Sequence, residues 1–221
     1  MSAFILSAAE YWESRYRENG TSWSGNVNAA LEREITGVVP GTALDLGSGE
    51  GGDALWLAHN GWAVTAVDVA PSALAIGAAA QNSEDNITWV AADLADWIPP
   101  TSYDLVTSCF LHSFVELPRE KILRRAAESV APEGLLLIVG HSGTPHWSNP
   151  DVRAHDHETT EFPTPDDMLE SLFRDNARLD LANWQVLTNA LIERPITGSD
   201  GAPATIVDSV LKLQRTAADS A

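Results

Sequence analysis

The sequence predicts an α/β fold: a doubly wound, mostly parallel sheet of seven strands, with helices on both faces and an antiparallel hairpin at the end. Two observations predict it. Between residues 43 and 139, short apolar runs alternate with helical stretches, which is the pattern of β-α-β units. After residue 184, two β-rich runs are separated by a loop containing Gly, Pro and Asp, which predicts a hairpin.

Two helices are predicted before the first strand. Ala8 to Asn19 has helical composition and is ended by Gly20. A loop from Thr21 to Asn28 then leads into a short helix from Val27 to Ile35. The first of these helices carries several aromatic side chains on one face, so it is expected to pack on the sheet or to cover a ligand.

The clearest unit runs from Ala43 to Asp68. An apolar run stops at a group of glycines, a helical stretch follows from Asp53 to Asn60, and a second apolar run, Ala63 to Val67, ends on Asp68. A turn this short cannot return the chain antiparallel across a helix. The two strands are therefore predicted to be parallel, with the helix crossing one face.

The middle of the chain repeats this alternation. Pro71 is suited to the first position of a helix that runs to about Gln81, because its missing N–H is not needed there. Strands are predicted at Asn86 to Ala91 and Tyr103 to Cys109, and a helix with a clear apolar stripe at Pro118 to Ala131. Leu135 to Val139 is a continuous apolar run, which predicts a strand buried on both faces.

The last third of the chain contains one helix and the terminal hairpin. Thr164 is the expected N-cap of a helix whose first residue is Pro165 and whose first turn is acidic. The hairpin strands are predicted at Trp184 to Glu193 and Thr205 to Leu213, with a loop from Pro195 to Pro203 between them.

The glycines after the first strand indicate a ligand site. Gly takes positive φ angles and has no side chain, so backbone N–H groups at the start of the next helix can approach polar or anionic atoms closely. Asp68 ends the second strand, where two ribose hydroxyls would need a charged acceptor. The stretch is interpreted as a nucleoside-binding pocket.

Two cofactor patterns fit these glycines. The pattern G-x-G-x-x-G, which permits an NAD site, is satisfied by Gly47, Gly49 and Gly52. The pattern acidic-x-G-x-G-x-G is equally satisfied, by Asp45, Gly47, Gly49 and Gly51. A carboxylate two residues before the first Gly would repel a pyrophosphate but suits the ammonium and sulfonium charges of S-adenosyl-L-methionine. The stretch resembles motif I of the class I S-adenosylmethionine-dependent methyltransferases.

The resemblance implies which residues bind the cofactor and its product, S-adenosyl-L-homocysteine. An Asp after the third strand, here Asp93, hydrogen-bonds the exocyclic amine of adenine in that family, with helix capping as the alternative role. The motif Tyr-Asp-Leu-Val at 103–106 is typical of the family's motif IV. The expected cofactor-binding residues are Trp23, Asp45, Gly47, Ser48, Gly49, Gly51, Asp68, Val69, Asp93, Leu94 and Cys109.

The N-terminal region resembles one particular group within this family. Trp12, Arg15, Tyr16 and Trp23 look like the N-terminal region of the thiopurine and tellurite-resistance methyltransferase group, where an aromatic residue covers the cofactor. The resemblance implies that Trp23 contacts the cofactor or the acceptor, and the alternative is a tryptophan that only anchors its loop.

The reaction implied is an in-line displacement, in which an acceptor lone pair attacks the S-methyl carbon. Because the sulfonium is already a strong alkylating group, the protein needs chiefly to align the acceptor and exclude water. An oxygen or amine acceptor gains from a base, for which His112 and then His141 are the candidates, although either can be a hydrogen-bonded structural residue. Cys109 is interpreted as a small buried residue rather than a nucleophile.

The composition of the chain limits the kinds of partner that the protein is expected to bind. The chain has 31 acidic and 13 basic residues, a net charge of −18, and the acids are scattered. Such a surface repels phosphate groups, so neither nucleic acid nor membrane is an expected partner. Its single cysteine excludes an internal disulfide, and no metal is expected at His155-x-His157. With no long apolar stretch and no signal-peptide pattern, a cytoplasmic enzyme is predicted.

The chain is predicted to be a single methyltransferase domain over 1–221, in four parts. These are an N-terminal helical lid (1–40), a cofactor-binding core (41–140), an acceptor-pocket loop (141–165), and a helix with the hairpin (166–216). The predicted activity is methyl transfer to a small-molecule acceptor, either a thiol, a chalcogen oxyanion, an amine or a phenol-like group, by a monomer or homodimer. The alternatives are a non-catalytic S-adenosylmethionine-binding regulatory module and an NAD-dependent oxidoreductase.

Overall fold

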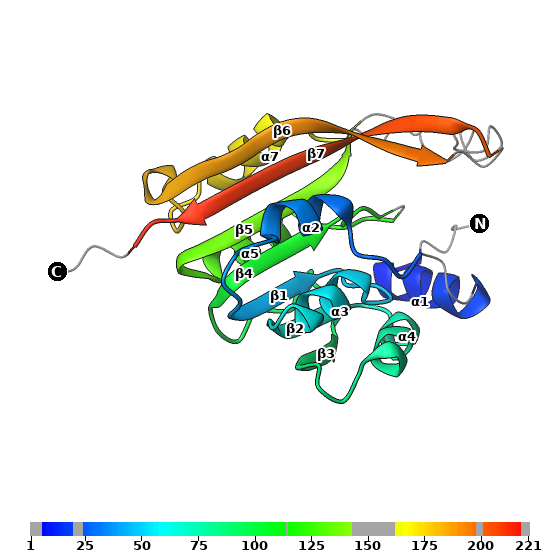
Figure 1. Cartoon of the computed structure of the whole chain (residues 1–221). Helices are drawn as coiled ribbons and strands as arrows, with labels where there is room; N and C mark the ends of the chain where they lie inside the picture. Colours follow the sequence, from blue (N-terminus) through cyan, green and yellow to red (C-terminus); the bar gives the residue numbers. More distant parts are fainter. Residues whose placement is uncertain (1–5, 20–23, 114, 143–161, 198–200, 218–221) are drawn as a thin grey trace, which may run out of the picture.

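A single seven-stranded sheet forms the centre of the computed structural model, which describes residues 6–19, 24–113, 115–142, 162–197 and 201–217 (Figure 1). The strand order is β3-β2-β1-β4-β5-β7-β6. The strands are β1 (Thr42–Leu46), β2 (Ala63–Asp68), β3 (Ile87–Ala91), β4 (Tyr103–Cys109), β5 (Val130–Ser142), β6 (Trp184–Thr197) and β7 (Pro203–Arg215).

Helices cover both faces of this sheet. They are α1 (Ala8–Asn19), α2 (Ala29–Ile35), α3 (Gly52–His59), α4 (Pro71–Ala80), α5 (Arg119–Glu128), α7 (Pro165–Phe173) and the short 3-10 helix η1 (Leu181–Asn183). Helices α2 and α3 share one apolar layer with the sheet, and α5 and α7 share the other. Among the described residues, no helix has the length and apolar character needed to cross a membrane.

The chain winds outward from β1 in both directions. Strands β1, β2 and β3 pair in parallel on one side, and the chain then crosses back to place β4 and β5 in parallel on the other side of β1. Only β7 runs antiparallel, between β5 and β6. The predicted fold class is confirmed. The reversal of winding lies between β1 and β4, and in open α/β sheets ligands bind at the carboxyl ends of the strands that flank such a point.

Strand β5 contains an uninterrupted apolar run because both of its faces are covered. Its side chains Leu135, Leu137 and Val139 join the layer with α2 and α3, whereas Leu136 and Ile138 pack with α5 and α7. Successive side chains of a strand point to opposite faces, so a strand covered on both sides needs apolar residues at every position.

The boundaries of α5, β5 and the terminal hairpin differ from the sequence prediction, and β5 covers Val130–Ser142 rather than Leu135 to Val139. Helix α5 ends at Glu128 rather than at Ala131, because Val130 pairs with Tyr103 and opens β5. Strand β6 runs to Thr197 rather than Glu193 and β7 begins at Pro203 rather than Thr205, so both strands enter the segment 195–203 that was expected to be a loop. An edge strand such as β6 tolerates proline where the missing N–H would face solvent.

The longer hairpin matters for the site. Strand β5 pairs with β7 only as far as Ser142 opposite Val207, while β7 and β6 continue to the pair Pro203 and Thr197. The hairpin tip therefore extends beyond the carboxyl end of β5, on the same side of the molecule as α1 (Figure 1). Both segments flank the edge at which the sheet order reverses.

We predict that Leu137→Ala lowers the free energy of unfolding by about 2–5 kcal/mol, because Leu137 is fully buried in the centre of the sheet and its loss leaves a cavity. Chemical denaturation monitored by circular dichroism measures this change. The matched control is Leu191→Ala on β6, where the leucine is 54% exposed and the change is expected to stay within about 0.5 kcal/mol. Equal losses in both variants would contradict the burial described for β5.

Candidate functional site

The glycine turn between β1 and α3 forms the floor of the candidate site. Gly47, Gly49 and Gly51 have φ angles of 73°, 52° and 82°, in the region that favours glycine. The N–H groups of Gly47 and Ser48 donate to the carbonyl of Val67, at 2.8 and 3.1 Å. The turn is therefore fixed against the end of β2, at the carboxyl edge of the sheet.

Asp45 lies beneath this turn and is only 2% exposed. Its Oδ1 accepts a hydrogen bond of 3.0 Å from the Thr107 hydroxyl, whereas its Oδ2 is buried with no hydrogen-bond partner among the described residues. Burial raises the pKa of Asp45 to about 8, with a further contribution from the nearby carboxyl of Asp53. A cationic ligand group would give Oδ2 a partner and stabilise the ionised form.

Asp68 joins the end of β2 to the glycine turn. Its Oδ2 accepts a 2.9 Å hydrogen bond from the Gly49 N–H, and its Oδ1 accepts one of 2.9 Å from the Ala70 N–H. Burial raises the pKa of this carboxyl, and the backbone hydrogen bonds oppose the increase. Each carboxylate oxygen has a second lone pair, so Asp68 retains the capacity to accept hydrogen bonds from ligand hydroxyls.

Asp53, in the first turn of α3, was not among the predicted site residues. Its Oδ1 accepts a 2.6 Å hydrogen bond from the Asn28 N–H, and its side chain is also hydrogen-bonded to Cys109. Burial raises the pKa of Asp53. In the part of the chain that the structure describes, Asp45, Asp53 and Asp68 form no ion pair. Two buried acids and one half-buried acid, with no cationic partner in the described part of the chain, make this edge suited to a positively charged ligand group.

The Cys109 thiol lies within this group of acids. Burial raises its pKa well above the ordinary value, and the neighbouring Asp53 and Asp45 carboxyls add to the effect. The thiol therefore stays protonated at neutral pH, and the reactive thiolate form is not populated.

The other predicted cofactor-binding residues lie in three different environments. Asp93 is exposed, and its Oδ1 accepts a 2.9 Å hydrogen bond from the Ala95 N–H. Asp93 therefore caps the turn after β3 through Oδ1, and this capping bond does not use Oδ2. Leu94 is buried in the apolar layer of α5, and Val69 is half-buried beside Asp68. Trp23 lies outside the described residues.

Helix α1 bridges the two sides of this edge. The Trp12 indole N–H donates to the Ser113 hydroxyl at 3.2 Å, in the segment after β4. On the other side, Glu13 accepts hydrogen bonds from the Ser72 N–H at 3.0 Å and the Ser72 hydroxyl at 2.6 Å, at the start of α4. Tyr16 is buried against the start of α4 as well. These contacts hold α1 beside the glycine turn, which is the position expected of a lid.

The ends of β4 and β5 carry a group of flat rings. The rings of Phe110 and His141 stack with 4.3 Å between their centroids, and His112 lies nearly parallel to His141 at 5.6 Å. Phe162 packs edge-on against both histidines. We call these four residues the ring cluster. The cluster brings together both predicted base candidates, which lie far apart in the sequence.

The two histidines have different surroundings. His112 Nε2 accepts a 3.2 Å hydrogen bond from the His141 backbone N–H, so its lone pair is engaged. Burial, followed by the charge of Arg119, lowers the pKa of His112 to about 3. Burial also lowers the pKa of His141, whose Nδ1 lies 3.9 Å from Asp208 Oδ1. Both rings are neutral at neutral pH. One ring nitrogen of His112 accepts a hydrogen bond, whereas neither ring nitrogen of His141 has one among the described residues.

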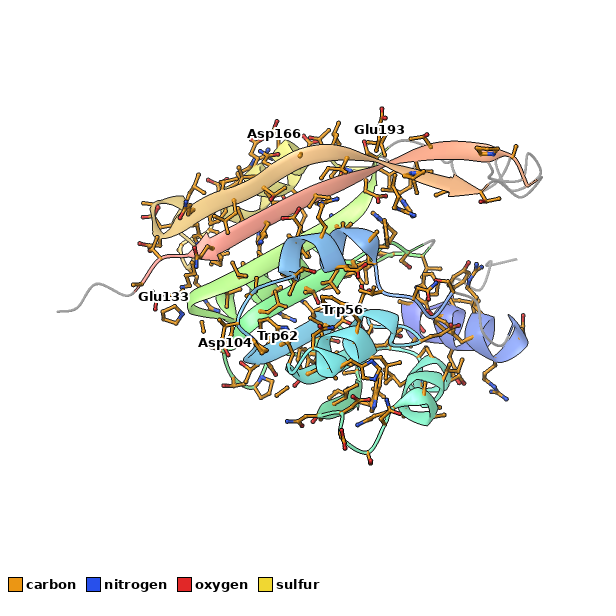
Figure 2. All side chains as sticks on the ribbon, in the orientation of Figure 1. Trp56, Trp62, Asp104, Glu133, Asp166 and Glu193 are labelled. Carbon is orange, nitrogen blue, oxygen red and sulfur yellow. The ribbon has the colours of Figure 1, made fainter. Side chains whose placement is uncertain are left out.

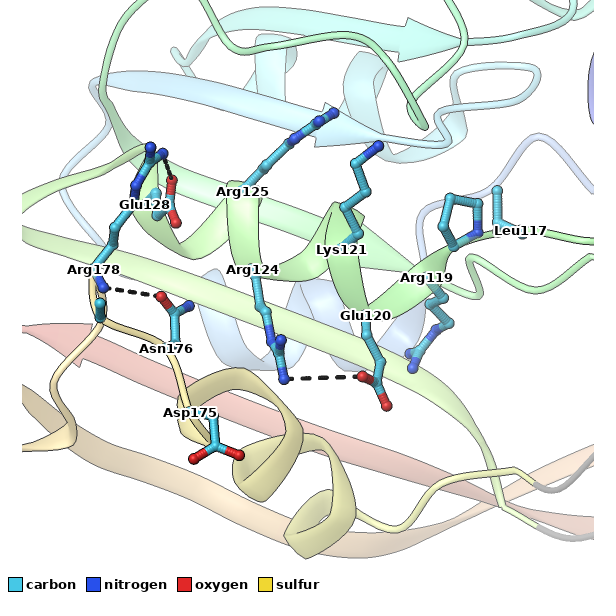
Figure 3. Close-up of a pocket in the computed structure, with 12 residues that line it drawn as sticks. Leu117, Arg119, Glu120, Lys121, Arg124, Arg125, Glu128, Asp175, Asn176 and Arg178 are labelled. Carbon is cyan, nitrogen blue, oxygen red and sulfur yellow. Dashed lines mark hydrogen bonds and ion pairs between the residues drawn. The ribbon is translucent and has the colours of Figure 1, made fainter.

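A second hollow lies elsewhere on the molecule, between α5 and residues 175–178 (Figure 3). Its volume is about 830 Å³. Four of its charged side chains form two ion pairs, Arg178 with Glu128 at 3.2 Å and Arg124 with Glu120 at 3.9 Å. The glycine turn and the buried acids do not line it, so the cofactor prediction does not apply there.

The sheet order, the glycine turn at the point where winding reverses and the acid at the end of β2 define the class: this is the fold of the class I S-adenosylmethionine-dependent methyltransferases. Residues 43–134 match the sequence model of a family described as "Methyltransferase domain". The chain therefore has the fold of these methyltransferases, and the match over residues 43–134 agrees with the family resemblance noted in the sequence.

One curated relative is 2-heptyl-1-hydroxyquinolin-4(1H)-one methyltransferase from Mycobacteroides abscessus. It is 35% identical over 110 residues, which cover 47% of this chain and 47% of the relative. The match thus spans about half the length of that protein. Two solved structures cover far more of the chain.

TehB from Haemophilus influenzae has a TM-score of 0.65 at 20% identity and covers 93% of this chain and 67% of TehB. A structure described as "Conversion of a Disulfide Bond into a Thioacetal Group during Echinomycin Biosynthesis" has a TM-score of 0.68 at 20% identity, with 97% of this chain and 94% of that chain covered. At these identities the likeness establishes the fold. Other structures of this fold hold S-adenosylmethionine or S-adenosylhomocysteine.

We predict that Asp45→Asn flattens the pH dependence of stability of the ligand-free protein. Because the pKa of Asp45 is raised to about 8, the folded state holds a proton that the unfolded state has already released above about pH 4. The free energy of unfolding contributed by this group therefore falls as pH rises, by up to about 1.4 kcal/mol per pH unit, and levels off above the folded pKa.

Denaturation of both proteins between pH 5 and 8 measures the difference between them, in which the other titrating groups cancel. The free energy of unfolding of Asp45→Asn, relative to that of the wild type, should increase with pH across this range. Asp104→Asn, at an exposed carboxyl on β4, is the control that should keep the wild-type slope. Parallel curves for the wild type and Asp45→Asn would show that Asp45 is ionised in the ligand-free fold.

Proposed function

We propose that this protein transfers a methyl group from S-adenosylmethionine to a small-molecule acceptor and releases S-adenosylhomocysteine. The single observation that carries the proposal is the buried Oδ2 of Asp45, which has no described hydrogen-bond partner and lies beneath the glycine turn. The ammonium group of the cofactor supplies the missing partner. A pyrophosphate at the same place would meet an acid, so the site favours S-adenosylmethionine over a nicotinamide dinucleotide.

The residues present fit the whole cofactor. We assign Asp68 to the ribose hydroxyls, because each of its carboxylate oxygens keeps a second lone pair for a ligand hydrogen bond. The Ser48 hydroxyl is also buried without a described partner and would gain one from a bound ligand. For Asp93 we propose that the oxygen left over from turn capping accepts a hydrogen bond from the adenine amine.

The cofactor supplies an activated methyl group when bound. The tasks of the protein are then to align the acceptor with the methyl carbon and to keep water away. Helix α1 closes one side of the edge, through Trp12 and Glu13, and the hairpin tip extends over the other. The ring cluster lies between them at the ends of β4 and β5, which is where we place the acceptor.

The nature of the acceptor follows from these surroundings. A protein with a net charge of −18 disfavours a nucleic acid or another polyanion, and the ring cluster favours a small molecule with a flat apolar part. The curated relative, whose name specifies a hydroxyquinolinone acceptor, supports the same type of substrate. We propose a cytoplasmic enzyme acting as a monomer or homodimer.

The proposal is tested by following labelled methyl groups from S-adenosylmethionine to a panel of thiols, tellurite, amines and phenols. Transfer to any of them, with stoichiometric formation of S-adenosylhomocysteine, supports the proposal. Tight cofactor binding with no transfer to any acceptor would favour a non-catalytic binding module instead. Absence of cofactor binding would overturn both.

We predict that Asp68→Asn weakens S-adenosylhomocysteine binding by about 1.5–3 kcal/mol, or about 10–150-fold in Kd, because a charged acceptor for the ribose is lost. Calorimetric titration measures this change. Asp104→Asn is the matched control: Asp104 also accepts a backbone N–H, that of Thr42 at 2.8 Å, but lies at the opposite end of the strands from α1 (Figure 2). Unchanged affinity in Asp68→Asn would remove Asp68 from the ribose site.

A further inference from the structure

An ion pair between buried Asp208 and half-buried Arg194 on the terminal hairpin faces the ring cluster. Asp208 on β7 is 2% exposed and accepts hydrogen bonds from Arg194 on β6, at 2.7 Å from Nε and 3.3 Å from Nη2. Asp208 is also the direct cross-strand partner of His141 on β5. The nearest approach is 3.9 Å, between Asp208 Oδ1 and His141 Nδ1. Three strands thus form one row: guanidinium, carboxylate and imidazole.

From this row we infer that His141 is the general base for a hydroxyl acceptor carried on a flat aromatic ring, and that Asp208 and Arg194 are positioning residues for His141. The inference rests on the proposed methyl transfer and names the substrate class of that site. It also adds two residues that neither the motifs nor the cofactor pocket indicates.

The position of Asp208 explains how the imidazole would be held. A carboxylate beside Nδ1 favours the tautomer that carries its proton there, which leaves the Nε2 lone pair free to accept a proton. The separation of 3.9 Å is longer than a hydrogen bond, and such contacts in ligand-free sites shorten when the reacting complex forms. Arg194 holds the carboxylate in place through the 2.7 Å contact from Nε to Oδ2.

The choice between the two histidines also follows from the contacts. His112 accepts the His141 backbone N–H through Nε2, so its lone pair is not available to a substrate. It lies beside Arg119, whose positive charge opposes protonation of the ring. His141 faces Asp208, which favours the imidazolium, as well as Arg194 and neutral His112. Among the residues that the structure describes, His141 is the one of the two rings with a neighbouring carboxylate to stabilise the charge that forms during proton transfer.

The flat acceptor is inferred from the stacking. Phe110 has a φ of 53°, which is uncommon for a residue other than glycine, and this conformation places its ring against His141. The Arg194 guanidinium carbon lies 6.0 Å from the centre of the Phe110 ring. Flat groups therefore border the site at the end of β4, and an aromatic ring is the ligand shape that packs best against them.

Methyl transfer to the hydroxyl oxygen breaks two bonds and forms two. The acceptor O–H bond breaks and its proton passes to His141 Nε2, while an oxygen lone pair forms the new bond to the methyl carbon. The carbon–sulfur bond breaks and its electron pair stays on sulfur, which gives neutral S-adenosylhomocysteine. The imidazolium, stabilised by Asp208, then releases its proton to solvent. An aromatic thiol ionises unaided near neutral pH and gains little from the base.

The test compares 2-naphthol with 2-naphthalenethiol, two acceptors that share one flat ring and differ in the nucleophilic atom. For Asp208→Asn we expect kcat with 2-naphthol to fall about 10–100-fold, with KM and the rate for the thiol unchanged within about twofold. The acidic limb of the kcat profile should move to lower pH, because removal of the carboxylate charge lowers the pKa of the imidazolium. Asp208→Glu should restore part of the rate.

Three further results decide the proposal. Asp166→Asn is the control: Asp166, at the start of α7, accepts a 2.6 Å hydrogen bond from Asn189 of β6 and is not among the charges that act on His141, so both rates and the pH profile should be unchanged. Equal losses for naphthol and thiol in Asp208→Asn would make Asp208 a structural residue and overturn the inference. A wild type that methylates the thiol but not the naphthol would also overturn it, while leaving methyl transfer intact.

The proposed function fails in a distinguishable way. If the wild type methylates neither acceptor and calorimetry shows no binding of S-adenosylhomocysteine, the methyl-transfer proposal and this inference fall together. If the cofactor binds and neither acceptor is methylated, the inferred acceptor class is wrong and the cofactor site remains.

Discussion

The burial of three carboxyl groups without a described counter-ion is the constraint on which the rest of this structure depends. Asp45, Asp53 and Asp68 lie at the carboxyl edge of the sheet, and burial raises the pKa of each. Without a ligand this arrangement does not stabilise the fold, because desolvation disfavours the ionised form of each carboxyl group. The arrangement becomes favourable when a cation binds, and the proposed cofactor, S-adenosylmethionine, carries an ammonium and a sulfonium charge.

The sheet divides the site into two halves with different chemistry. Strands β1 and β2, with the glycine turn, form a half built from backbone N–H groups and buried acids. The ends of β4 and β5, with the hairpin, form a half built from aromatic rings and one buried ion pair. The first half suits a charged nucleoside, and the second suits a flat acceptor. Helix α1 joins the halves by hydrogen bonds at both of its sides.

Much of the cofactor half was predictable from the sequence because its determinants are local. The spacing of Gly47, Gly49 and Gly51 and the acids at two strand ends lie within one β-α-β unit, and the three glycines have the positive φ expected of them. Asp53 was missed because an acid in the first turn of a helix is ordinarily explained by the helix dipole. Only the fold shows that it is buried beside Asp45.

The acceptor half was predictable only in part. Both histidines were candidates from their positions after strands, but the hydrogen bond that engages His112 Nε2 depends on how β4 and β5 end together. Asp208 and Arg194 carried no sequence signal, since an isolated acid and an isolated arginine in a hairpin are common. Their relation to His141 arises from strand register across the last three strands. The hairpin also extends further than its composition indicated, because edge strands accept proline.

The most direct test of this account is calorimetric titration of the wild-type protein with S-adenosylmethionine and, separately, with NADH at pH 7. The account predicts one saturable site for S-adenosylmethionine and no measurable heat of binding for NADH, because the cationic ligand pairs with the buried Asp45 carboxyl and stabilises its ionised form, whereas a pyrophosphate gains no partner there. Tighter binding of NADH, or no binding of S-adenosylmethionine, would contradict it.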